Sequence, residues 1–170
     1  MSSTAVPERG PALPASAFDF LPGNWNVAMR QRKIDGTLQV LGDWVPFDAS
    51  ATFERVLNGT AVFGKYELHK PDGTVPAVDF RFLDPATKTW TIYWAGANDH
   101  QWQDSPMRGG FATPDAMVFI MDDTLAGHAV LTRFVWRVPS HDHALWEQSF
   151  SNDRGKTWVA NWTMDFTRAK

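Results

Sequence analysis

The residues best suited to proton-transfer chemistry lie in one stretch near the middle of the chain. His100 follows Asp99 and precedes Asp104, and an imidazole beside carboxylates can act as a general base. Tyr93, a short distance upstream, is the second candidate. These side chains would suit a cofactor-free isomerase, cyclase or hydrolase, although a histidine in such a stretch is more commonly an exposed loop residue.

A second group has the spacing of half a cupin metal motif. His141 and His143 stand two residues apart with Glu147 four residues further on, and two histidines at this spacing can share one face of a strand. The pair adjoins Pro139-Ser140, however, and no histidine follows Glu147. We therefore expect a solvated turn here, and the sequence predicts no metal and no cofactor.

Composition narrows the function classes further. The 170 residues include no Cys, which excludes disulfides and thiolate chemistry. The net charge is -3 with 16 scattered Lys and Arg, so no basic surface for nucleic acid is expected. Residues 1–17 contain three Pro and no apolar run, so we expect no signal peptide, no membrane segment and a cytoplasmic location.

The elements that must position these residues are short strands. Trp25, Val27 and Met29 alternate with polar residues, which is typical of a half-buried strand. Asn58-Gly59 between two strand-like segments predicts a hairpin, because this dipeptide readily adopts positive φ. Short connections and the absence of a helical pattern favour an all-β, antiparallel up-and-down barrel of about ten strands. The doubtful strands are residues 38–44 and 107–111.

Aromatic residues are the main anomaly of the composition. There are 9 Trp and 12 Phe, and so many rings must fill a core, line a cavity or cover an interface. Alternation indicates one bulky face, and the expected members are Phe80, Phe82, Trp90, Ile92, Trp94, Phe134, Trp136, Trp146, Phe150, Trp158, Trp162, Met164 and Phe166. The opposite face would be solvated, with Asp79, Arg81, Thr91, Arg133, Arg137, Glu147, Asn161, Thr163 and Asp165.

A small closed barrel has interior room for side chains or for one small ligand. If the bulky face encloses a cavity, Gln148 is the expected polar contact, because alternation places it between Trp146 and Phe150. Residues 95–106 would form a lid. The expected ligand-contacting rings are Phe82, Trp94, Trp102, Trp136, Trp146 and Trp162.

The start of the barrel carries a family resemblance. Gly23-Asn24-Trp25 resembles the Gly-x-Trp signature of lipocalins and other calycins. In those barrels the Trp lies across the closed end, and an Arg near the end of the last strand stacks on it. The resemblance implies that Trp25 and Arg168 close this barrel, with a cation over an indole ring.

Longer motifs make the resemblance more specific. Phe-Asp-Phe-Leu-x-Gly-x-Trp at residues 18–25, Arg-Phe-Leu-Asp-Pro at 81–85 and Trp-Glu-Gln-Ser-Phe-Ser at 146–151 together resemble a family of uncharacterised bacterial lipocalin-like barrels. The Pro-rich composition of residues 1–17 predicts a flexible arm, and Phe18, Phe20 and Leu21 before the Pro-Gly turn predict a short plug at the start of a barrel domain over 18–170. Asn26-Val27-Ala28 departs from the Gly-x-Gly of nitrobindin-type haem barrels, which argues against haem.

Three functions follow as expectations. The leading one is binding of a small hydrophobic or aromatic molecule inside the barrel. The second is a cofactor-free enzyme using the same cavity beneath His100 or Tyr93. The third is a homodimer whose aromatic face serves the interface and encloses no cavity.

Overall fold

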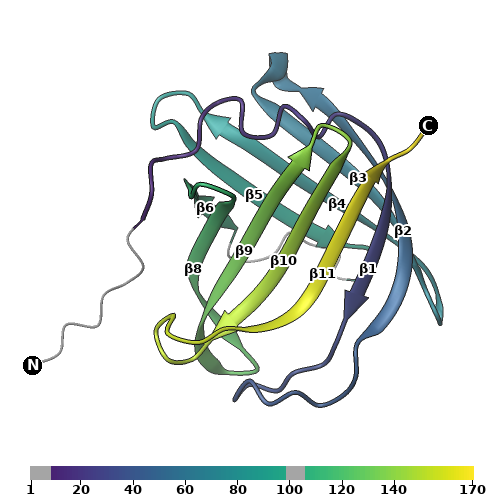
Figure 1. Cartoon of the computed structure of the whole chain (residues 1–170), viewed down its shortest axis with the longest axis vertical. Helices are drawn as coiled ribbons and strands as arrows, with labels where there is room; N and C mark the ends of the chain where they lie inside the picture. The colour runs from purple at the N-terminus through teal and green to yellow at the C-terminus, as the bar shows by residue number, and fades with distance from the viewer. Residues whose placement is uncertain (1–8, 99–105) are drawn as a thin grey trace, which may run out of the picture.

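A computed structural model describes residues 9–98 and 106–170, in which eleven antiparallel strands form one sheet that curls into a nearly closed barrel (Figure 1). The all-β up-and-down barrel is thus confirmed, and it is compatible with a lipocalin-like fold. The strands are β1 (Gly23–Gln31), β2 (Val45–Val56), β3 (Ala61–Lys70), β4 (Gly73–Asp84), β5 (Thr89–Gly96), β6 (Met107–Gly109), β7 (Phe111–Ala112), β8 (Met117–Leu125), β9 (His128–Ser140), β10 (His143–Ser151) and β11 (Val159–Arg168).

The sheet order is β6-β5-β4-β3-β2-β1-β11-β10-β9-β8-β7. The first strand therefore pairs with the last, and Trp25 lies opposite Arg168. All the remaining paired strands are consecutive in the sequence. Among the described residues the one helical element is the three-residue 3-10 turn η1 (Leu57–Gly59), and no helix there is long and apolar enough to cross a lipid bilayer.

The strand count exceeds the expected ten because one strand is broken. β6 pairs with β5 while β7 pairs with β8. Gly109, the last residue of β6, and Gly110, which separates the two strands, have φ angles of 87° and 90°. These left-handed values interrupt the extended backbone and favour glycine. The other doubtful segment, residues 38–44, contains no strand and only the isolated bridge between Ile34 and Val40.

The hairpin at Asn58-Gly59 forms, but with a longer turn than the dipeptide alone predicts. Val56 pairs with Ala61, so four residues connect β2 to β3. Leu57 adopts a positive φ of 51°, as do Asn58 at 55° and Gly59 at 84°.

The expected bulky face is wrong on β4. Asp79 pairs with Trp94, and Arg81 pairs with Ile92, so Asp79 and Arg81 face inward and each is only 2% exposed. Phe80 and Phe82 face outward instead and are half-buried. The alternation rule assigned the rings to the interior because it treats charged residues as solvated, whereas these two opposite charges are buried together.

The outward rings form a strip on the barrel exterior. Phe80 packs against Phe63 and Phe82, with ring centroids 6.0 and 5.6 Å apart, and Phe82 stacks on Tyr93 at 5.9 Å. The aromatic side chains of this sheet therefore do not all face the interior.

The described part of the N-terminal segment, residues 9–17, packs against the barrel. Leu13 is buried, and Trp90 donates its indole N–H to the Pro14 carbonyl at 3.0 Å. The plug follows at once, with Phe18, Phe20 and Leu21 all buried. Figure 1 shows this segment crossing the same end of the barrel as the C-terminus. We call this the closed end, and the opposite end, where β1 finishes and β11 begins, the open end.

Candidate functional site

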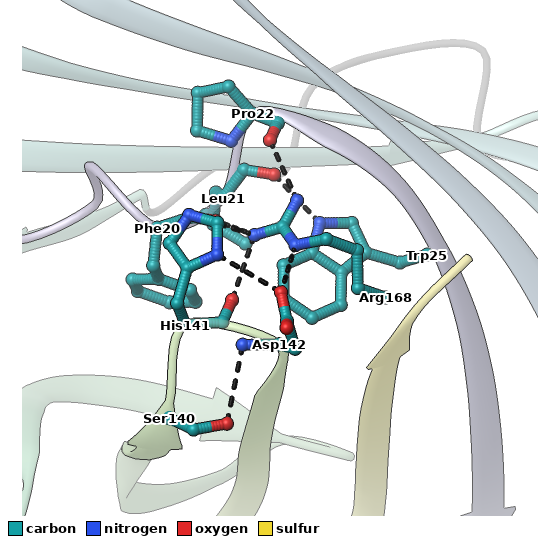
Figure 2. Close-up of polar contacts among 8 residues, drawn as sticks. All are labelled: Phe20, Leu21, Pro22, Trp25, Ser140, His141, Asp142 and Arg168. Atoms are coloured by element: carbon teal, nitrogen blue, oxygen red, sulfur yellow. Dashed lines mark hydrogen bonds and ion pairs between the residues drawn. The ribbon is translucent and has the colours of Figure 1, made fainter. Parts of the chain in front are cut away.

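The closed end is sealed by a cation over an indole ring. The Arg168 guanidinium carbon lies 4.2 Å from the centre of the Trp25 ring, and Trp25 donates its indole N–H to the Leu21 carbonyl at 2.7 Å. Trp25 is 1% exposed. The plug and the last strand are thus joined through one buried ring (Figure 2).

Arg168 uses all three of its side-chain nitrogens at this end (Figure 2). Nε donates to Asp142 Oδ1 at 2.9 Å, and Nη1 donates to the Pro22 carbonyl at 3.0 Å. Nη2 donates to the carbonyls of Phe20 and His141 at 2.7 and 2.8 Å. The hydrogen bond from His141 and the contact with Arg168 lower the pKa of the Asp142 carboxyl below its usual value.

Glycine at position 23 makes this arrangement possible. Its φ is 124°, and a Cβ there would lie 2.6 Å from Arg168 Nη1. Any larger residue would displace the guanidinium from its carbonyl acceptors. The Gly of the Gly-x-Trp motif therefore makes room for the Arg.

The two histidines with cupin-like spacing, His141 and His143, contact different carboxylates and do not converge on one point. His143 Nε2 contacts Asp165 Oδ1 at 2.9 Å, while His141 contacts Asp142 at 3.0 Å and remains exposed. Across residues 9–98 and 106–170, no cluster of three His, Asp or Glu could hold a metal ion.

A cavity of about 60 Å³ lies inside the barrel. Four of the rings expected as walls line it, namely Trp94, Trp136, Trp146 and Trp162. Phe82 does not, because it faces outward. The remaining lining residues are Tyr66, Asp79, Arg81, Ile92, Phe134 and Met164.

Gln148 does not line this cavity. Its side chain donates to Asn161 Oδ1 at 3.1 Å, and the pairing of β10 with β11 shifts register between Gln148 and Ser149. Tyr93 lies on the outer strip, and His100 and Trp102, with most of the expected lid, lie outside the described residues. The chemistry of the cavity therefore rests on other side chains.

Sequence reasoning missed the polar centre of the cavity. Arg81 Nη2 donates to Asp79 Oδ2 at 2.5 Å, and the Tyr66 hydroxyl donates to the same oxygen at 2.7 Å. The side chains of Asp79 and Arg81 are each 3% exposed. This is a buried ion pair with a phenol attached, which we call the Arg81 centre.

Burial controls the protonation of this centre. Removal from water raises the pKa of Asp79, with Arg81 and the Tyr66 hydroxyl acting in the opposite direction. Burial also raises the pKa of Tyr66 well above its ordinary value, and the nearby Asp79 charge adds to that rise. Both effects show an interior that resists further negative charge.

Aromatic rings hold the Arg81 guanidinium from several sides. Its carbon lies 5.1 Å from the Phe18 ring, 5.4 Å from Phe53 and 5.5 Å from Trp136. The plug therefore contributes one wall of the Arg81 centre as well as closing the barrel. Such contacts fix the direction of the guanidinium without using its N–H groups.

Several hydrogen-bond donors on the cavity wall lack an acceptor from the described residues. They are Arg81 Nε and Nη1 and the indole nitrogens of Trp136 and Trp162, and one acceptor, Asp79 Oδ1, is likewise unpaired among these residues. Buried donors are normally paired, because an unpaired one forfeits its hydration. The cavity is consequently richer in unused donors than in unused acceptors.

Gly64 gives the buried carboxylate its space. It lies opposite both Asp79 and Phe53 in the sheet, and a Cβ there would collide with Asp79 Oδ1 and come within 2.6 Å of Phe53 Cε1. A glycine inside a strand often marks such a close approach. This glycine, interrupting the alternation of residues 61–70, was the signal that could have revealed the site.

Comparison with known proteins adds no assignment, since the chain matches neither a protein-family model nor a curated protein.

Proposed function

We propose that the barrel binds a small hydrophobic or aromatic molecule in its interior cavity, in the manner of lipocalin-like barrels. The observation that carries the proposal is the composition of the wall, in which four Trp rings surround one buried polar centre. Apolar walls with a few placed polar groups are typical of small-molecule sites. A core built for stability alone would be expected to pair its polar atoms or omit them.

The size of the cavity limits the ligand. A volume of about 60 Å³ accommodates a few water molecules, whereas pockets for drug-sized ligands typically reach about 300 Å³ or more. The ligand is therefore either very small or displaces a ring as it enters.

The rings suited to such displacement lie toward the open end. Trp94 and Trp162 are only partly buried, and they pack edge to face with centroids 5.5 Å apart. Trp162 pairs with Gln31 at the last position of β1, far along the strand from the Trp25 seal. We place access to the cavity between these two rings.

Methyl NMR provides a direct test. Met164 lines the cavity, and the chain has six Met residues in all. In protein labelled at the Met methyl groups, titration with benzene, toluene and indole should shift the Met164 resonance, assigned with Met164→Leu. The resonance of Met121, which does not line this cavity, serves as the internal control. If none of these probes moves Met164, the binding proposal fails.

A cofactor-free enzyme is the second candidate, and one observation favours it. Asp79 is a buried carboxyl on the cavity wall with a raised pKa, and ionisable groups displaced in this way are common in active sites. Asp79 replaces His100 and Tyr93 as the proposed proton acceptor. This role can be tested in deuterated solvent, where NMR follows the replacement by deuterium of the C–H protons next to the carbonyl of a bound ketone. Asp79→Asn should abolish that exchange.

A further inference from the structure

The unused donors of the cavity identify the chemistry of the ligand. Arg81 offers Nε and Nη1, and Trp136 offers its indole N–H. The Arg81 guanidinium carbon and the Trp136 ring centre are 5.5 Å apart, and both residues line the cavity. Arg81 and Trp136 are each 2% exposed, and a bound molecule could satisfy these groups only by presenting acceptors.

The charges of the Arg81 centre restrict the net charge that a ligand can carry. The Arg81 cation is balanced by the Asp79 anion in direct contact, and the Tyr66 hydroxyl proton is already donated to that carboxylate. An anionic ligand would leave one uncompensated negative charge in an aromatic interior, which is unfavourable. Among the described residues, a cationic ligand would meet four unpaired donors and one unpaired acceptor, Asp79 Oδ1, so donors predominate against it.

We propose that the ligand is an uncharged carbonyl compound, such as an aryl ketone, aldehyde, quinone or amide, whose oxygen accepts hydrogen bonds from Arg81 and Trp136. This assignment rests on the proposed function, because it names the class of molecule that the cavity binds. The apolar part of the ligand then lies against the rings of Trp94, Trp146 and Trp162. The raised pKa values of Asp79 and Tyr66 agree with a site that disfavours negative charge.

Three probes of similar size separate the possibilities without any mutation. Acetophenone carries the carbonyl, ethylbenzene lacks it, and benzoate carries a negative charge. Because hydrogen bonds from a charged donor are strong, we expect acetophenone to bind at least about tenfold more tightly than ethylbenzene in calorimetric titrations. Benzoate should bind more weakly than acetophenone at neutral pH.

Indole variants locate the contact. Trp136→Phe keeps a ring but removes the N–H, so it should reduce the preference for acetophenone over ethylbenzene by about threefold or more. Trp158→Phe is the matched control. The Trp158 indole N–H already donates to the Gly155 carbonyl at 3.2 Å, and Trp158 does not line the cavity. In 15N-labelled protein the Trp136 indole N–H resonance, assigned from this variant, should shift further with acetophenone than with ethylbenzene.

Each outcome decides a separate point. Equal affinities for acetophenone and ethylbenzene would overturn the carbonyl assignment while leaving the proposed binding function intact. Tightest binding of benzoate would overturn the requirement for an uncharged ligand. If no probe binds and Met164 stays unmoved, the proposed function itself fails and the donors are satisfied by water. Loss of preference in Trp158→Phe as large as in Trp136→Phe would contradict the placement of the contact.

Discussion

Arg168 and Arg81 are two arginines in similar surroundings with opposite degrees of hydrogen bonding. Each guanidinium lies close to a Trp ring, at 4.2 Å from Trp25 for Arg168 and 5.5 Å from Trp136 for Arg81. Arg168 donates from all three nitrogens, whereas Arg81 finds an acceptor among the described residues only at Nη2. The first arrangement is complete in itself, and the second leaves donors for another molecule.

Burial makes the difference more consequential. The Arg168 side chain is 20% exposed, while that of Arg81 is 3% exposed. Water can therefore assist Arg168 but is largely removed from Arg81, where an unpaired donor costs about 1–3 kcal/mol. We therefore expect the closed end to contribute to stability and the Arg81 centre to reduce it.

The largest expected effect comes from removing the charge partner of Arg81. Asp79→Ala should lower the free energy of unfolding by about 3–5 kcal/mol, because it leaves a buried cation unpaired. The double variant Asp79→Leu/Arg81→Met removes both charges and should recover most of that loss. Urea unfolding followed by Trp fluorescence measures both variants. A double variant as unstable as the single one would show that the ion pair itself holds the fold together.

Breaking the closed end should reduce stability without changing ligand choice. Arg168→Ala deletes the donors to Asp142 and to the plug carbonyls, and we expect a loss of about 2–3 kcal/mol in the free energy of unfolding. The acetophenone preference should stay as in the unmodified protein at a temperature where the variant is folded. A selective loss of binding at unchanged stability would contradict the assignment of ligand access to the end opposite Arg168.

Gly64 offers a steric test of the Arg81 centre. Gly64→Ala forces a Cβ against Asp79 and the Phe53 ring, and overpacking of this kind costs about 1–3 kcal/mol. Adding Phe53→Leu should relieve part of the loss, which a double-mutant cycle in urea would measure. Strict additivity of the two changes would contradict the proposed crowding.

The smallest effect concerns alkaline stability. The pKa of Tyr66 is raised in the folded protein, so the folded state keeps the phenol proton at a pH where the unfolded chain has lost it. This contribution to stability is complete below about pH 10 and is lost as the pH rises toward the folded-state pKa. At alkaline pH the stability of Tyr66→Phe should therefore fall less steeply with rising pH than that of the unmodified protein.

Tyrosinate absorbance checks this prediction. Since Tyr66 and Tyr93 are the two tyrosines of the chain, Tyr66→Phe should remove the part of the absorbance change that appears only with unfolding. Tyr93→Phe is the control and should retain it. If the stability of Tyr66→Phe falls as steeply with rising pH as that of the unmodified protein, burial of the phenol has no bearing on alkaline unfolding.

The fold was largely predictable because its signals are local. Alternation at Trp25, Val27 and Met29 and the turn dipeptide Asn58-Gly59 required no knowledge of partners in space. Asp79 and Arg81 were placed on the wrong face because their inward orientation depends on each other and on Gly64, a residue on the neighbouring strand. No pattern within one strand reports such compensation.

Part of the candidate site was predictable and part was not. Alternation placed Trp94, Trp136, Trp146 and Trp162 on one face, and all four line the cavity. Gln148 is not among the cavity-lining residues, and its side chain donates to Asn161, the residue that the register shift leaves unpaired on β11. A single inserted residue in the pairing is invisible to a period-two pattern.

The broken strand at Gly109-Gly110 gives the barrel a seam. Along it, β6 meets β5 over three residue pairs and β7 meets β8 over two, whereas the first and last strands are joined by seven pairs from Trp25 to Gln31. Fewer hydrogen bonds lower the free energy of local opening. The barrel should therefore open locally along this seam more often than between β1 and β11. Amide hydrogen exchange should be fast beside the seam and slow where the first and last strands pair.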